Sequence, residues 1–285
     1  MSGAEAAIFQ AARAKPFSIG MAPIDADDWI QVDGLHAAHC ALKADILARQ
    51  GREAFDAIPG SEAAQAEAAE RLVAHLRRRF PEIPTALDPG EPPLKAVSRC
   101  VQEDLLLMSR QPEGWTLNAG SLSFPTTWRL SEKIGRPMAS IHAPVPGYAG
   151  PMAERIQRIF DHLRPEAPVE RHNLSIYADA ELRHEKTKTG ADRFPDGAPI
   201  LSLAHLRVER QTLTRLPATG AILFTVRIYL MRLSESPPRL AALVRAHVAE
   251  MKDEELVYKG LLASRARLLN ALEGLTRREE PSLDA

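Results

Sequence analysis

The sequence predicts an α+β protein with an antiparallel sheet and flanking helices. Several segments in the middle of the chain alternate apolar and polar residues as strands do, whereas helical periodicity dominates both ends. No strand–helix–strand unit repeats along the 285 residues. We therefore expect hairpin-like strand pairing, with helices at both ends and between the hairpins.

Helical patterns occupy most of the first 80 residues. Residues 1–16 are Ala-rich and predict a tail or a short helix. Residues 35–52 carry apolar side chains at helical spacing and reach Gly51, a residue type that often stops a helix. A clearer helix spans residues 61–80, where Ser61 suits the N-cap and Pro81 ends the pattern.

Strand patterns follow the Pro-rich connection at residues 84–93. Residues 101–110 are apolar and predict a short buried helix or strand. Residues 115–128 alternate on both sides of Gly120, so they predict a hairpin that turns there. Residues 171–177 form another expected strand. Residues 201–214 and 221–232 predict two antiparallel strands with a tight connection.

Further helices and a long loop complete the expected organisation. Residues 152–163 predict an amphipathic helix, and residues 182–199 predict a long loop of the kind that often acts as a lid. One long helix is expected from Pro237 to Leu268, with a disordered tail after it. The expected division is a tail over 1–16, one domain over 17–235 with helical insertions, and a C-terminal helix and tail over 236–285.

Composition argues against nucleic acid and membrane partners. The formal net charge is -1, and the basic residues are scattered rather than clustered. The longest apolar runs are too short to span hydrocarbon, and no export signal is evident. We expect a cytoplasmic protein whose two cysteines are reduced and whose partner is a small molecule or another protein.

Several common reaction centres have no motif in this sequence. It contains neither a GxGxxG nor a GxxxxGK nucleotide loop, no GxSxG elbow and no HExxH zinc motif. Two cysteines cannot ligate an iron–sulfur cluster. His36 and His39 have a spacing compatible with metal binding, but no third local ligand completes a site. Electrons would therefore come from another protein, and histidine remains the candidate ligand for a redox centre.

His142 is the histidine with the most informative surroundings. It follows the apolar run at residues 138–141 and precedes the stiff sequence APVPG, which would fix the direction of its imidazole at the edge of a pocket. A fixed imidazole suits an axial iron ligand. The alternative, which periodicity alone favours, is a core histidine bonded to the backbone.

Polar residues alternate along the last two predicted strands of the chain. Arg207, Glu209 and Gln211 share one face of the first strand, and Arg227 and Tyr229 alternate likewise on the second. Such charged faces are costly to bury without a partner, so we expect them to line one cavity. The alternative is a solvated face with cross-strand ion pairs.

These segments also carry a resemblance to a known family. The chain resembles the haem-dependent oxidative N-demethylases through the blocks VQEDLLLM (101–108), GWTLNAGSLSFPTTW (114–128), KIGRPMASIHAPVPG (133–147), RHNLSI (171–176) and RVERQTLTRLPATGAILFTVRIY (207–229). Each block alone is weak. Their order and spacing over residues 17–235 make the resemblance specific.

The resemblance implies a PAS-like fold that binds haem and removes a methyl group from a small secondary amine such as dimethylamine, using dioxygen. NADPH, flavin and an iron–sulfur cluster are expected on separate reductase or ferredoxin-type subunits. By the same analogy, His142 is the expected iron ligand and His172 the reserve.

The resemblance also gives roles to the polar strand residues. Glu209, Arg227 and Tyr229 are the expected catalytic residues, because a cationic amine needs a carboxylate or an aromatic face and bound dioxygen needs donors. Arg207 and Arg210 are expected to bind the haem propionates, since guanidinium pairs well with carboxylate.

Two positions depart from the family pattern and bear on the choice of amine. Leu174 stands where the family usually has Trp, and Ile228 stands where it usually has Thr. A haem-containing gas or redox sensor without catalysis is one alternative function. A ligand-binding module that has lost haem is another.

Overall fold

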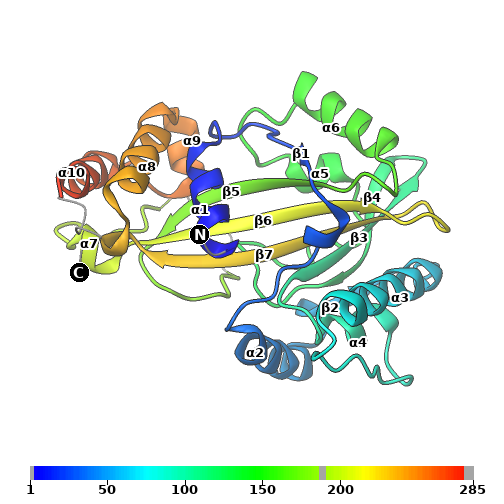
Figure 1. Ribbon diagram of the computed structural model, residues 1–285. Helices are drawn as coiled ribbons and strands as arrows, with labels where there is room; N and C mark the ends of the chain where they lie inside the picture. Colours follow the sequence, from blue (N-terminus) through cyan, green and yellow to red (C-terminus); the bar gives the residue numbers. More distant parts are fainter. Residues whose placement is uncertain (1–2, 186–190, 279–285) are drawn as a thin grey trace.

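The structure, a computed structural model, describes residues 3–185 and 191–278 and is built on a seven-stranded antiparallel sheet (Figure 1). The strands are β1 (Ala22–Pro23), β2 (Phe55–Ala57), β3 (Asp104–Gln111), β4 (Gly114–Ser121), β5 (Val169–Tyr177), β6 (His205–Arg215) and β7 (Ile222–Arg232). Their order across the sheet is β1-β5-β6-β7-β3-β4-β2. With helices on its flanks, the sheet confirms the predicted α+β class.

Ten α-helices are found within the described ranges. They are α1 (Gly3–Arg13), α2 (His36–Arg49), α3 (Glu62–Arg79), α4 (Pro93–Ser98), α5 (Met138–His142), α6 (Pro151–His162), α7 (Ile200–Leu203), α8 (Pro238–Glu250), α9 (Asp253–Lys259) and α10 (Arg265–Thr276). Short 3-10 turns occur at Ala26–Asp28, Gly51–Glu53 and Leu233–Glu235. The helices expected near residues 35–52, 61–80 and 152–163 are thus confirmed as α2, α3 and α6.

The strongest sequence patterns form the centre of the sheet. β6 and β7 pair along their full lengths, from His205 opposite Arg232 to Arg215 opposite Ile222. Gly220 in the connection has a φ of 69°, a conformation that glycine adopts without strain. β5 lies on the other side of β6, with Asn173 opposite Glu209. The predicted antiparallel pair and the predicted strand over 171–177 are therefore confirmed.

The hairpin predicted to turn at Gly120 is wrong. β4 continues through Gly120, which lies between Leu106 of β3 and Asp56 of β2. A Cβ at this position would lie 2.8 Å from Cδ1 of Leu130, so the glycine permits close packing across the strand. The true hairpin joins β3 to β4 just before Gly114, and residues 104–110 belong to a strand rather than a helix.

The single long C-terminal helix is also wrong, since three helices occupy that segment. α8 ends before Met251, whose backbone is extended. α9 begins after Lys252, where the Glu255 carboxylate accepts a hydrogen bond from the Lys252 backbone N–H at 2.8 Å. It ends at Gly260, which is left-handed with a φ of 64°. These breaks bring the end of α9 against the sheet.

The two faces of the sheet have different covers. Apolar side chains such as Leu174 and Val208 pack against α1, α8 and α10, and those of β3 pack against α3 and α4. We call this side the strap face, because residues 24–35, the N-terminal strap, also cross it (Figure 1). The opposite side, here the cavity face, is covered by α5, α6 and the connection from β4.

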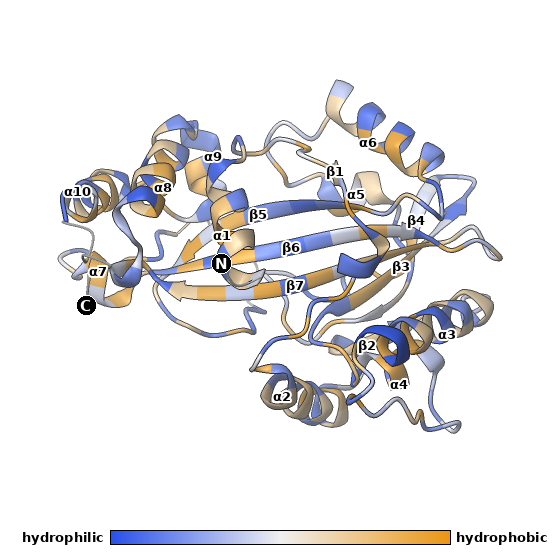
Figure 2. Cartoon of the chain, viewed as in Figure 1, coloured by the Kyte–Doolittle hydropathy of each residue, from blue (hydrophilic) through white to orange (hydrophobic). Residues whose placement is uncertain are grey.

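Hydropathy shows where the sheet departs from an apolar core. In Figure 2 the middle of β5 and of β6 is hydrophilic, whereas most of β7 is apolar. Buried polar groups need partners, so the polar middle of the sheet marks a place that packing alone does not explain.

Some expectations lie partly or wholly outside the described residues. These are the middle of the predicted long loop, at 186–190, and most of the predicted disordered tail, at 279–285. Among the described helices, none has the length and apolar character needed to cross a bilayer.

Replacing Gly260 by Ala is expected to destabilise the fold by about 1–3 kcal/mol. A Cβ there would lie 2.9 Å from the carbonyl oxygen of Ala191, in a left-handed conformation that disfavours side chains. Gly274 in α10 is the matched control, because no heavy atom lies within 4 Å of its Cβ position. Gly274→Ala is expected to stabilise by about 0.5–1 kcal/mol through helix propensity. Urea denaturation checks both, and effects of the same sign would contradict the account of α9.

Candidate functional site

A cavity of about 680 Å³ lies between the cavity face of the sheet and α5, α6 and the connection from β4. Pockets for cofactors and other small molecules occupy roughly 300–1,000 Å³, so the volume suits a large ligand. The apolar lining comes mainly from β3, β4, β7, α5 and α6 and includes Leu106, Met108, Leu117, Phe124, Met138, Ile156, Phe160 and Phe224. The polar lining comes mainly from β5, β6 and α9 and includes Arg171, Asn173, Ser175, Glu209, Gln211 and Lys259.

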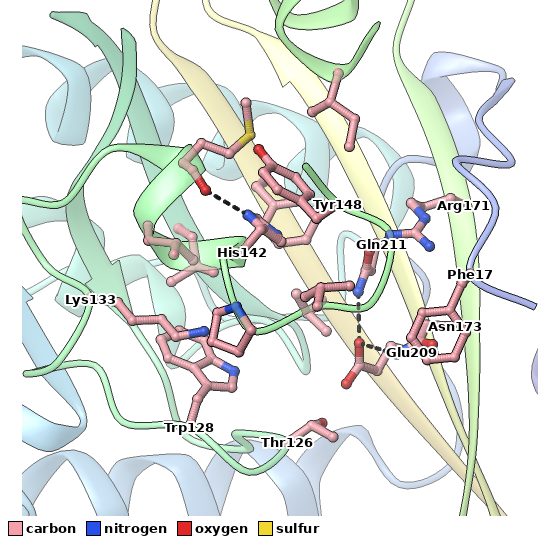
Figure 3. Close-up of a pocket in the computed structure, with 18 of the residues that line it drawn as sticks. Phe17, Thr126, Trp128, Lys133, His142, Tyr148, Arg171, Asn173, Glu209 and Gln211 are labelled. Atoms are coloured by element: carbon pink, nitrogen blue, oxygen red, sulfur yellow. Dashed lines mark hydrogen bonds between the residues drawn. The ribbon is translucent and has the colours of Figure 1, made fainter. Parts of the chain in front are cut away.

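His142 lines this cavity and is held in one orientation (Figure 3). It ends the short helix α5, and its Nδ1 lies 3.0 Å from the carbonyl oxygen of Met138. Its ring stacks on that of Tyr148, with centroids 5.0 Å apart and planes 17° apart. Because a carbonyl oxygen only accepts hydrogen bonds, Nδ1 carries the proton and Nε2 keeps its lone pair.

The environment keeps the His142 imidazole neutral. Burial lowers its pKa to about 4, and the positive charges of Lys133 and Arg171 act in the same direction. The Met138 carbonyl opposes this shift but does not outweigh it. A neutral imidazole with a free Nε2, facing a largely apolar cavity, fits the requirements of a haem ligand. At Nδ1 the structure thus shows the alternative interpretation, a histidine bonded to the backbone, and at Nε2 it shows no hydrogen bond to a described residue.

Glu209 is the buried carboxylate of the same cavity. It accepts hydrogen bonds from Asn173 Nδ2 at 3.2 Å and from Gln211 Nε2 at 2.7 Å (Figure 3). Burial alone would raise its pKa, but the hydrogen bonds from Thr126 and Asn173 and the charges of Arg207 and Lys259 leave it below the ordinary value. Glu209 is therefore an anion at neutral pH, placed to bind a cation.

Lys259 also lines the cavity, and sequence reasoning missed it. Its Nζ donates to Asn173 Oδ1, to the carbonyl oxygen of Leu174 and to Ser175 Oγ, at 2.9, 2.9 and 3.0 Å. Burial lowers its pKa to about 7, although the Glu209 charge opposes the shift. Since Asn173 bonds both Lys259 and Glu209, the three form one network. Gly260 and the acidic residues after Lys252 were the signals for a separate helix, but only the fold places that helix at the cavity.

Arg207 shares the cavity face of β6 but does not line the cavity. It donates to Thr126 Oγ1 and to the carbonyl oxygens of Phe124, Glu181 and Leu182, at distances of 2.9–3.2 Å. Its guanidinium is fully buried, and it joins the connection after β4 to the segment after β5. The arrangement is that of a structural brace.

Arg210 points to the strap face. It forms an ion pair with Glu170 at 2.7 Å and donates to the carbonyl oxygen of Trp29 at 3.0 Å. His172 lies opposite Arg210 in the register and so shares that face. The structure therefore brings neither the predicted propionate ligand Arg210 nor the reserve iron ligand His172 to the cavity.

Arg227 and Tyr229 lie on the strap face as well. The register of β6 and β7 puts Ile228 opposite Glu209, so the residues on either side of Ile228 point away from the cavity. Arg227 pairs with Asp33 of the strap at 2.7 Å, and the Tyr229 hydroxyl donates to Gln31. The two polar faces predicted to line one cavity thus lie on opposite sides of the sheet.

The two departures from the family pattern also lie away from the cavity lining. Leu174 packs in the cluster with α1 and α8, and Ile228 packs with Phe124 and residues of α2.

His36 bonds the Cys100 carbonyl oxygen and His39 lies against Gln102. Among the described residues, no three or more His, Cys, Asp or Glu side chains come together in a group that could hold a metal ion.

Comparison with known families agrees with the sequence blocks. The family model described as haem-dependent oxidative N-demethylase, alpha subunit-like, matches residues 20–86 and 82–269. The match includes His142, Glu209 and Lys259 and spans most of the chain. The strands that carry the cavity, β3 to β7, all fall within it.

The folding stability of the haem-free protein is expected to fall as the pH drops from about 6.5 to 4, in part because of His142. In this window the unfolded chain binds a proton at His142 that the folded chain excludes, since the folded pKa is about 4. Protonation therefore favours unfolding. His142→Gln should lose less stability than the wild type between pH 7 and 4.5 in urea denaturation. Equal losses would show that the native imidazole is not buried as described, because the other buried histidines remain in both proteins.

Proposed function

We propose that this chain, which belongs to the family of haem-dependent oxidative N-demethylase alpha subunit-like proteins, binds haem in the cavity with Nε2 of His142 as the iron ligand. One observation carries the proposal. The Met138 carbonyl and the Tyr148 ring fix a neutral imidazole whose free nitrogen is available to a cavity of about 680 Å³. Apolar walls on one side suit the macrocycle, and the polar walls suit its carboxylates and a substrate.

The proposed architecture is PAS-like. An antiparallel sheet in which inserted helices and a long connection cover one face and enclose a ligand cavity supports this assignment. The fold alone does not carry the function, because the same sheet serves many roles in other proteins. The function rests on the side chains that line the cavity.

The proposed reaction is the removal of one methyl group from a small secondary amine of the dimethylamine type. Bound haem would supply dioxygen activation. One oxygen atom enters the methyl carbon, which leaves as formaldehyde, and the other leaves as water. Two electrons and two protons enter, and a primary amine remains. The electrons would come from NADPH through flavin and iron–sulfur groups on partner subunits, which the description of the family as an alpha subunit supports. We place the protein in the cytoplasm.

Glu209 is the proposed site for the cationic amine. A secondary amine is protonated at neutral pH, and a buried carboxylate is its natural partner. Asn173 and Gln211 hold the carboxylate in place, and its negative charge would stabilise the bound ammonium group. The apolar wall around Phe124 and Phe160 offers water no hydrogen-bond partner and suits the methyl groups of the amine. Arg227 and Tyr229 would serve as supports, since they hold the strap behind the sheet.

Haemin titration is expected to give a Soret band that depends on His142. His142→Ala removes the proposed ligand and should abolish or shift the band in ferric, ferrous and CO-bound spectra. His172→Ala is the matched control, because His172 lies on the strap face and should leave the spectra unchanged. Binding indifferent to His142 but sensitive to His172 would contradict the assignment. If the protein does not bind haem stoichiometrically, the proposed function is wrong.

Glu209→Gln is expected to weaken binding of dimethylamine to the haem protein by about ten- to a hundredfold, because it removes a charge-assisted hydrogen bond. The amine-induced shift of the haem spectrum measures the dissociation constant. Haemin binding itself should not change, which serves as the internal control. Formaldehyde release, with electrons from ascorbate and a mediator, should fall in parallel. A spectrum that responds to haem ligands, with no formaldehyde from any amine, would instead indicate a sensor.

A further inference from the structure

The Arg171 side chain lines the cavity, and its guanidinium has no carboxylate partner among the described residues. It lies on β5 opposite Gln211 and lines the cavity on the same face as Glu209 (Figure 3). Nη1 lies 3.4 Å from Gln211 Oε1, and Nη2 donates to the carbonyl oxygen of Ser18 at 3.1 Å. Nε is buried and has no hydrogen-bond partner among the described residues. One contact at each Nη thus holds the guanidinium in place, and each Nη keeps a second N–H for a further acceptor.

The other carboxylates of the cavity are already engaged or exposed. Asp104 accepts the backbone N–H groups of Ser123 and Phe124, and Glu170 pairs with Arg210. Glu209 accepts from Asn173 and Gln211. The two remaining acidic residues in the lining, Glu132 and Glu254, are exposed to solvent. No ion pair of the described residues includes Arg171.

A buried cation without an anion is costly, and a ligand can supply the missing charge. Burial lowers the pKa of Arg171, and the Glu209 charge only partly opposes the shift. Guanidinium offers several donors in a planar fork that matches a carboxylate, so an anionic group of the ligand is the natural partner. Arg207 and Arg210 differ in this respect, because carbonyl oxygens and Glu170 already engage their donors.

We infer that Arg171 binds a carboxylate of the ligand, and that this carboxylate is a propionate of haem. The inference rests on the proposed function, since it places the iron at His142. Figure 3 shows the His142 ring and the Arg171 guanidinium at the same cavity, and the Arg171 charge is near enough to lower the His142 pKa. The carboxylates of a haem lie at its rim, so Arg171, which lines the same cavity as His142, would hold one of them.

The test compares haemin with haemin dimethyl ester, in which the ring and the iron are the same and the carboxylates are neutral. Both are titrated into the full-length protein and followed by absorption. The wild type should bind haemin at least about tenfold more tightly than the diester, since a charge-assisted contact is lost. Arg171→Gln should bind haemin about as weakly as the wild type binds the diester, with little further change for the diester. Arg171→Lys should retain part of the preference.

Arg136→Gln is the matched control, because Arg136 is an exposed arginine on the same connection as Lys133 and does not line the cavity. It should keep the full preference. Thermal unfolding of each variant separates a binding defect from misfolding, and the comparison of the two ligands in the wild type needs no variant.

Two results would overturn the inference while haem still binds through His142. One is equal affinity of the wild type for haemin and its diester. The other is a preference that survives in Arg171→Gln. If N-methylglycine, but not dimethylamine, then shifts the spectrum only when Arg171 is present, the carboxylate belongs to the substrate and the inference fails. Absence of haemin binding by the wild type would instead remove the proposed function.

Discussion

Successive side chains of a strand point to opposite faces of the sheet, and along β6 this alternation decides which side chains line the cavity. Glu209 and Gln211 line the cavity, whereas Val208 and Arg210 point to the strap face. The register then fixes the neighbouring strands. Asn173 lies opposite Glu209 on β5, so the amide that holds the carboxylate comes from the adjacent strand. A shift of β6 by one residue would exchange its two faces and turn Glu209 and Gln211 away from the cavity.

The strap face shows why the polar middle of the sheet tolerates burial. Arg210 and Arg227 are almost fully buried, yet both have partners: Arg210 pairs with Glu170 and donates to backbone carbonyl oxygens of the strap, and Arg227 pairs with Asp33 of the strap and contacts His39 of α2. Removing one partner of such a pair costs about 3–5 kcal/mol, because the other charge is left uncompensated. These pairs tie the N-terminal strap to β6 and β7 and so hold the strands that present Glu209. The cavity face contains the exception, Arg171, whose missing anion we assign to the ligand.

Sequence patterns predicted the strands but not how they face each other. β5, β6 and β7 were expected because their alternation and the Gly220 connection are local signals. Whether Arg227 lies on the same face as Glu209 depends on the register of the hairpin, and no local sequence pattern gives that register. The same holds for Gly120, where a turn residue instead permits close packing against Leu130. His142 could be predicted as a fixed histidine, since the surrounding prolines restrict the chain.

The break after α8 had weaker signals, because the apolar periodicity continues across Met251. Helix propensity and amphipathic spacing favoured one long helix, and the separate α9 follows from a capping interaction at Lys252 and the left-handed Gly260. Lys259 reaches the cavity only because of these breaks. Its contacts with Asn173, Leu174 and Ser175 link sequence positions more than 80 apart, which explains why local patterns could not reveal them.

The central claim is that a neutral, fixed His142 ligates haem iron on the cavity face of the sheet. A crystal structure of the haemin complex tests it most directly. Nε2 of His142 is expected to ligate the iron while Nδ1 still donates to the Met138 carbonyl oxygen, with Glu209 in the same cavity. Iron held by any other side chain, or a haem bound on the strap face near His172, would contradict the account.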